Sequence, residues 1–249
     1  MRIGGSLTIV CGHHMEDSSW ILDVADIPHV FEIVVYDTKQ LTLPTHPKIS
    51  VIDKSKFIKK GFPSIAYHYC ANYTPRTTHV IFLHGHNKSW HQKMSIAQIV
   101  HGCVQILCRN PFIPFVKLSD AVYKDWLDFD NGYGMLDFVH RYWNTLSPAF
   151  PDDIMPPAML VDINTEQCLV HRDRLRDRSH ADWQLLFELA CNVKFHSWEE
   201  YALEGVFHRV MGEPWVRDYI HENLNAIADG KNELELRLDE IGKHKLKST

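Results

Sequence analysis

Short apolar runs rich in β-branched residues alternate with longer segments of helical spacing along most of this chain. The short runs are typical of buried strands, and the longer segments are typical of helices that pack on a sheet. We expect strands at residues 6–11, 31–36, 49–53, 79–83 and 159–163. Strands that alternate with helices at this spacing usually pair in parallel through right-handed crossovers. The sequence therefore predicts a three-layer α/β fold, with a mostly parallel sheet flanked by helices.

Helical spacing extends to the end of the chain. We expect helices that begin near Ser18 or Ser19 and that cover residues 61–73, 94–108, 181–190, 201–211, 215–228 and 233–246. Residues 111–157 are rich in aromatic residues and broken by Pro and Gly, which indicates an irregular excursion that builds a pocket wall or packs in the core. We predict an α/β catalytic domain over residues 1–213 and a helical appendage over residues 214–249, the last helix being either solvated or docked.

Composition limits the classes of partner. The chain has 249 residues and a formal net charge of −5, and no cluster of basic residues marks a nucleic-acid or anionic membrane surface. No apolar stretch is long enough to span a bilayer, and the 6 cysteines form no Cys-x-x-Cys pair. We therefore expect no nucleic acid, no transmembrane segment, reduced thiols and a cytoplasmic location.

Histidines follow the apolar run at residues 79–83, where open α/β sheets hold their ligands. His84 and His86 occupy alternate positions, so on an extended strand both imidazoles point to one face and would bind one divalent ion. The alternative is that they hydrogen-bond loop carbonyls. His91 and the first-loop residues His13, His14, Glu16 and Asp17 strengthen the metal hypothesis only if the fold brings them close to this pair.

Asp37 ends the second predicted strand, a position where acidic residues accept hydrogen bonds from a ribose in nucleotide-binding α/β folds. A turn or helix-cap aspartate is the competing interpretation. The chain has neither a Rossmann nor a P-loop glycine pattern, which argues against dinucleotide oxidoreductases and P-loop phosphotransferases. His84-Gly85 is similar to the oxyanion turn of α/β-hydrolases, but no Gly-x-Ser-x-Gly elbow accompanies it.

Two further segments carry groups suited to a transfer reaction. Arg172 and Arg174 would bind diphosphate oxygens, although the aspartates interleaved with them favour a self-neutralised surface. Glu204 lies in an otherwise apolar segment, where partial burial would suit it to accept a proton. The alternative is a carboxylate that caps a helix N-terminus.

Several motifs, taken together, resemble the family catalogued as domain of unknown function 3431. The resemblance covers most of residues 8–213. Its most specific part is the Phe-x-His-Gly-His segment at residues 82–86, followed by Ser-Trp-His at residues 89–91. The other matching segments are residues 16–20, 35–37, 61–73 and 203–212. The chain departs from the family pattern at residues 13–15 and 62–63.

The order of elements is similar to that of GT-A-type glycosyltransferases, and this likeness implies roles for individual residues. It implies that the first loop (His13, Glu16 and Asp17) and Asp37 hold the nucleotide, that His84-Gly85-His86 replaces the metal-binding Asp-x-Asp, and that Glu204 activates the acceptor. We place Trp90 and His91 in the acceptor pocket, and Arg172 and Arg174 near the leaving diphosphate.

The leading hypothesis is a glycosyltransferase that moves a sugar from a nucleotide-diphosphate sugar to a hydroxyl acceptor, such as a glycan. A divalent ion would assist, Mn²⁺ or Mg²⁺ first and Zn²⁺ as the alternative, because imidazoles are poorer ligands than carboxylates for manganese. The runner-up is a zinc-type hydrolase that uses His84, His86, His91 and a first-loop carboxylate. A non-catalytic carbohydrate- or nucleotide-binding module is the third class.

Overall fold

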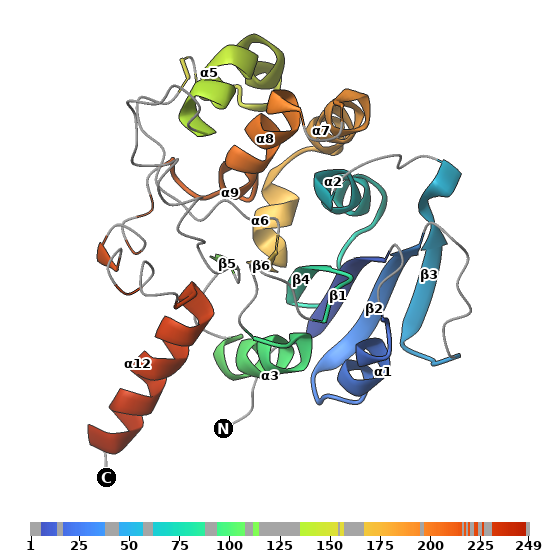
Figure 1. Ribbon diagram of the computed structural model, residues 1–249, viewed down its shortest axis with the longest axis vertical. Helices are drawn as coiled ribbons and strands as arrows, with labels where there is room; N and C mark the ends of the chain where they lie inside the picture. Colours follow the sequence, from blue (N-terminus) through green and yellow to red (C-terminus); the bar gives the residue numbers. More distant parts are fainter. Residues whose placement is uncertain are drawn as a thin grey trace.

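The computed structural model describes most of the chain and shows a central sheet between layers of helices (Figure 1). The described residues are 6–13, 17–37, 45–56, 62–87, 94–107, 112–114, 135–153, 155–156, 167–194, 197–215, 217, 219, 222–223, 226 and 231–247. The strand expected at residues 159–163 lies outside them, as does most of the helix expected at residues 215–228.

The sheet has six strands in the order β3-β2-β1-β4-β6-β5. These are β1 (Leu7–His13), β2 (Val30–Asp37), β3 (Ile49–Asp53), β4 (His79–His84), β5 (Phe112–Pro114) and β6 (Cys168–His171). Strands β3, β2, β1 and β4 are mutually parallel, whereas β6 runs antiparallel to both β4 and β5. The predicted α/β class with a mostly parallel sheet is therefore confirmed, and β5 and β6 are additions that the sequence patterns did not predict.

Helices cover both faces of this sheet. They are α1 (Trp20–Ala25), α2 (Phe62–Asn72), α3 (Ile96–Ile106), α5 (Met135–Leu146), α6 (Arg172–Asp177), α7 (His180–Asn192), α8 (Trp198–Gly205), α9 (Phe207–Val210) and α12 (Glu233–Lys247), with the 3₁₀ turns η1 (Lys54–Lys56) and η3 (Ser147–Ala149). The segment expected as one helix at residues 201–211 is two, α8 and α9, which meet at Val206. In the described part of the stretch at residues 111–157, α5 is a regular helix that the Pro and Gly breaks of the sequence did not indicate.

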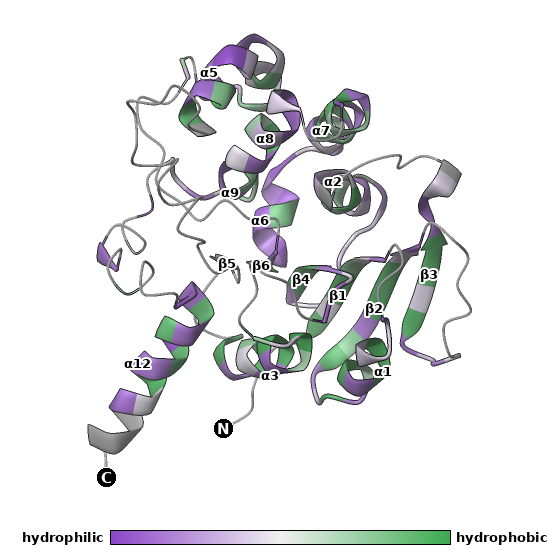
Figure 2. Ribbon diagram, in the orientation of Figure 1, coloured by the Kyte–Doolittle hydropathy of each residue, from purple (hydrophilic) through white to green (hydrophobic). Residues whose placement is uncertain are grey.

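Alternation along the strands sorts side chains between two cores. Val10 and Phe82 face the core formed with α2, α5, α7, α8 and α9. Ile9 and Ile81 face the opposite core, formed with α1 and α3. The central strands are buried on both sides, which explains their nearly continuous apolar sequences (Figure 2).

Two of the covering helices begin at capping boxes. The Ser95 side chain accepts a hydrogen bond from the amide of Gln98, and the Gln98 side chain accepts one from the amide of Ser95. Ser179 and Asp182 make the same reciprocal pair at the start of α7. Such boxes satisfy amides that the first helical turn leaves unpaired, so these two helices start at residues that the sequence specifies.

The C-terminal helix α12 docks on α3 and is tied to the body by charges. A Cβ atom at Gly102 would lie 3.1 Å from Leu238 Cδ1 and 3.2 Å from Leu234 Cδ2, so the two helices approach closely at this glycine. Leu234 is fully buried in the core on the α1 and α3 side. No helix in the described ranges is both long enough and apolar enough to cross a membrane.

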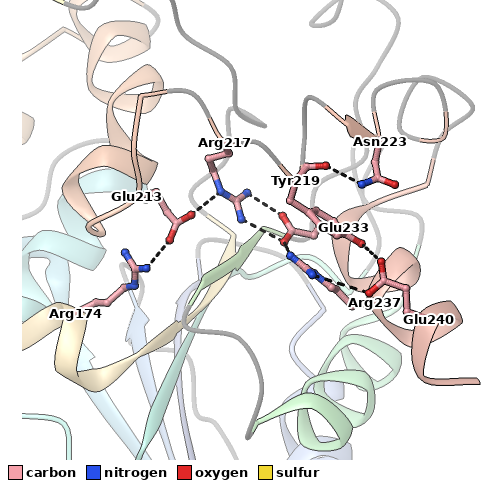
Figure 3. Close-up of polar contacts among 8 residues, drawn as sticks. All are labelled: Arg174, Glu213, Arg217, Tyr219, Asn223, Glu233, Arg237 and Glu240. Atoms are coloured by element: carbon pink, nitrogen blue, oxygen red, sulfur yellow. Dashed lines mark hydrogen bonds and ion pairs between the residues drawn. The ribbon is translucent and has the colours of Figure 1, made fainter. Parts of the chain in front are cut away.

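A chain of ion pairs runs from α6 to α12 (Figure 3). Arg174 Nη2 lies 2.9 Å from Glu213 Oε1, and Glu213 Oε2 lies 2.8 Å from Arg217 Nε. Glu233 then accepts from Arg217 Nη1 at 2.8 Å and Nη2 at 3.2 Å, and from Arg237 Nη2 at 3.2 Å. Glu233 is fully buried, so this carboxylate depends on the two arginines for the hydrogen bonds that water would otherwise supply.

Candidate functional site

Three parallel strands end in polar residues at one edge of the sheet. Gly12 of β1 pairs in register with His84 of β4, and His13 of β1 pairs with Asp37 of β2. Strands β2 and β3 lie in succession on one side of β1, and the next strand, β4, lies on the other side of β1. Such a reversal opens a crevice at the carboxyl ends of the strands, where α/β folds bind ligands. We therefore take the carboxyl ends of β1, β2 and β4 as the candidate site.

His13 and Asp37 form a buried pair at this edge. His13 Nδ1 lies 3.2 Å from Asp37 Oδ1, and each side chain is 1% exposed. An ionised carboxylate only accepts hydrogen bonds, so the bond requires that His13 Nδ1 carries the proton. In neutral His13 the basic nitrogen is then Nε2. Asp37 thus orients the ring and selects its tautomer, as carboxylates do for imidazoles that bind metals or move protons.

The turn after β4 is held from two distant parts of the chain. Trp20 Nε1 donates to the carbonyl oxygen of Gly85 at 2.8 Å, and the amide of His84 donates to Gln167 Oε1 at 3.1 Å. Trp20 begins α1, and Gln167 precedes β6. The sequence patterns indicated neither role, because a tryptophan at a helix start and a glutamine before a short strand carry no specific motif. These two bonds fix the backbone on which His84 and His86 stand.

Alternation places the histidines of neighbouring strands on different faces. His84 follows Phe82 by two residues and so belongs to the face covered by α2, α8 and α9, whereas His13 and Asp37 belong to the α1 and α3 face. The two groups share an edge of the sheet, but their side chains leave it in opposite directions.

Glu204 lies in the last turn of α8, which corrects the expectation that its segment starts a helix. Its side chain is half-buried. Ala202 and Leu203 of the same helix are buried in the core that contains Phe82. Glu204 therefore belongs to a helix on the same face of the sheet as His84.

The expected metal centre is incomplete in the described residues. Those residues contain no group of three or more His, Cys, Asp or Glu side chains placed to hold an ion. His84 and His86 alone supply two imidazoles, fewer ligands than a protein-bound divalent ion takes. Glu16, Trp90 and His91, which we expected to complete the metal and acceptor sites, lie outside the described residues.

Asp17 follows β1 and binds its own loop. Its Oδ1 accepts from the Ser19 amide at 2.9 Å and its Oδ2 accepts from Ser19 Oγ at 3.0 Å. These hydrogen bonds from Ser19 lower the pKa of the Asp17 carboxyl. Asp17 thus shapes the entry to α1, beside the site.

Arg172 and Arg174 do not belong to this site. His171, at the end of antiparallel β6, pairs with His79 at the start of β4, and the Arg172 amide donates to the Thr78 carbonyl oxygen at 2.9 Å. Both arginines therefore follow β6 to the amino edge of the parallel strands, opposite His84. Arg174 pairs with Glu213 and donates to the Gly212 carbonyl. The expectation that they stabilise a diphosphate beside His84 is wrong, because β6 runs antiparallel to β4 and ends at the opposite edge.

Neither a protein-family model nor a curated protein matches this chain. The resemblance to the domain of unknown function 3431 family stays a prediction.

Proposed function

We propose that the protein is a glycosyltransferase that uses a nucleotide-diphosphate sugar and a hydroxyl acceptor. The observation that supports it is the placement of His13, Asp37 and His84 at one carboxyl edge, where the strand order reverses between β1 and β4. A crevice of this kind suits a nucleotide, whose parts extend over several strand ends.

The buried His13–Asp37 pair changes the role expected for Asp37. The carboxylate is committed to His13, so we assign the donor contact to His13 and the orientation of its ring to Asp37. Because both side chains are 1% exposed, the proposal requires this edge to open when the donor binds.

Glu204 remains our proposed base for the acceptor hydroxyl, since its helix covers the face of the sheet to which His84 belongs. A metal bound by His84 and His86 would need further ligands beyond the described residues, so we assign it no step. Its chemical contribution would be to neutralise charge on the leaving diphosphate.

The His13–Asp37 pair also favours a second candidate, the zinc-type hydrolase. A carboxylate on the far nitrogen of an imidazole is the usual support of a histidine that binds zinc. In that alternative His13 would bind an ion on the α1 and α3 face, separate from the His84 and His86 pair.

Thermal unfolding with UDP- and GDP-sugars, each with and without Mn²⁺, tests the transferase proposal. A donor at about 100 times its dissociation constant adds about 2.7 kcal/mol, which raises the melting temperature by about 5 to 11 °C for a chain of this size. Absence of a shift with every donor would refute the proposal, and zinc that co-purifies with the protein and is lost in His84→Ala would favour the hydrolase.

The variant Asp37→Asn should abolish the donor-induced shift, because an amide no longer fixes the His13 tautomer. Its matched control is Asp53→Asn at the end of the next strand, where the carboxylate pairs in register with Asp37 but accepts from the Ser55 amide instead. Equal effects of both variants would count against a specific role for the pair. For Glu204→Gln we expect donor binding to persist and turnover to be lost.

A further inference from the structure

A cavity of about 410 Å³ opens between α2, α6 and α7. Its walls are the end of α2 with the loop that leads to β4, and the segment from α6 into α7; they comprise Cys70 to Pro75, Leu175, Arg176, Arg178, His180 and Trp183. The loop runs to the start of β4, so the cavity lies at the amino edge of the parallel strands, away from His84. Its volume lies within the range of small-molecule sites.

The residues that line the cavity carry positive charge. Two arginines and a histidine line the cavity and no Asp or Glu does, in a chain whose net charge is −5. Arg176 is exposed, and Pro75 carbonyl oxygen lies 3.5 Å from its Nη2. Arg178 donates to backbone carbonyls, from Nε to Val210 at 2.7 Å and from Nη1 to Ala149 at 2.6 Å. Burial lowers the pKa of Arg178, and the charges of Asp182 and Asp153 oppose this shift.

The acids that lie close to these arginines in the sequence include Asp177, which is exposed and does not line the cavity, and Asp182, which is already engaged. Asp182 Oδ2 accepts from the Ser179 amide at 3.1 Å and from Ser179 Oγ at 2.8 Å, as part of the cap of α7. It is not among the lining residues. An anion in the cavity would therefore meet guanidinium groups rather than a carboxylate.

Aromatic side chains form another part of the cavity wall. Tyr73 is 42% exposed, and its ring stacks on Tyr69 with centroids 5.5 Å apart and planes 13° from parallel. Trp183 is buried and fixed by a 2.9 Å bond from Nε1 to the Leu175 carbonyl oxygen. Rings held in this way offer a rigid apolar wall at low entropic cost.

We propose that this cavity binds a small organic anion, a phosphate or carboxylate group carried on a planar apolar body. Arg176 pairs with the anionic group, Arg178 adds positive potential, and Tyr73 contacts the planar part. This site is separate from the one at the carboxyl edge and does not depend on the proposed transferase activity.

Calorimetric titration of the full chain with phenyl phosphate, benzoate, inorganic phosphate and benzyl alcohol tests the proposal. We expect one of the two aromatic anions to bind more tightly than inorganic phosphate, with no heat from the neutral alcohol; the better of the two identifies the anionic group. Absence of binding by both aromatic anions up to about 10 mM, or binding of the neutral alcohol as tight as theirs, overturns the proposal.

Variants locate the binding. Arg176→Gln should raise the dissociation constant of the preferred anion by about 10-fold or more, because a charge-assisted hydrogen bond is lost. Arg76→Gln is the matched control, an exposed arginine next to Pro75 that does not line the cavity. Tyr73→Ser should lower the affinity for the aromatic anion and leave the affinity for inorganic phosphate unchanged. Equal losses in Arg176→Gln and Arg76→Gln would indicate general surface charge and would overturn the assignment.

Discussion

Replacement of Glu233 by glutamine should cost this protein much of its stability. The carboxylate is fully buried and accepts three hydrogen bonds, two from Arg217 and one from Arg237. An amide offers one acceptor oxygen and no charge, so in Glu233→Gln the buried Arg217, itself 4% exposed, loses the carboxylate of Glu233 and keeps that of Glu213 at 2.8 Å. Breaking one side of a buried ion pair costs about 3 to 5 kcal/mol. For a chain of this length that cost corresponds to a melting temperature lower by about 6 to 20 °C.

Glu240→Gln is the matched control for this measurement. Glu240 lies on the same helix as Glu233 and also near Arg237. Its side chain, however, is 48% exposed, and its Oε2 lies 3.9 Å from Arg237 Nη1. Exposed pairs contribute about 0 to 1 kcal/mol, so the control should melt within a few degrees of the unchanged protein. Scanning calorimetry of the unchanged protein and of the two variants at one protein concentration measures the three melting temperatures. Equal melting temperatures for Glu233→Gln and Glu240→Gln would refute the claim that the buried network holds α12 on the body.

Two further perturbations test the buried groups and the docking of α12. Burial lowers the pKa of His208 to about 3 and that of His79 to about 4, from an ordinary value of 6.5. The unfolded chain therefore binds more protons below pH 6.5, so stability falls with decreasing pH by about 1.4 kcal/mol per pH unit for His208 until its folded pKa is reached. Urea unfolding from pH 7 to 4 should show that the free energy of unfolding depends less on pH in His208→Gln than in the unchanged protein. His101→Gln, at an exposed site, should behave as the unchanged protein does. The same pH dependence in the unchanged protein and both variants would disprove the role given to His208. Gly102→Leu should overpack the contact with α12 and lower the free energy of unfolding by about 1 to 3 kcal/mol. Gly242→Leu is the control and should not destabilise the protein, because nothing lies within 4 Å of a Cβ at that position. Equal melting temperatures for the two variants would contradict close docking of α12 on α3.

The parallel half of the sheet was predictable because its strands are buried on both faces and their sequences are nearly continuous apolar runs. That inference also placed Asp37 and His84 at one edge. It did not give the register that pairs His13 with Asp37, since register depends on contacts between strands and not on either sequence alone.

The errors have a common physical origin. Strand β6 is short, and its direction depends on the path by which the chain returns to the sheet, which local patterns do not encode. Because neither β6 nor its direction was predicted, Arg172 and Arg174 were assigned to the wrong edge. Gln167 was missed for the same reason, because its position beside the His84 amide exists only once β6 is paired with β4.

The anchoring of Gly85 by Trp20 and of His84 by Gln167 also bears on how the site comes into being during synthesis. Trp20 precedes Gly85 by 65 positions, whereas Gln167 follows His84 by 83, so the first half of the polypeptide carries the histidines and one of their two backbone supports long before the other has been made. A nascent chain that has not yet released residue 167 from the ribosome can build the four parallel strands and still lack a finished turn after β4. Competence for ligand binding would then be acquired late, in step with the arrival of an element that contributes none of the histidines.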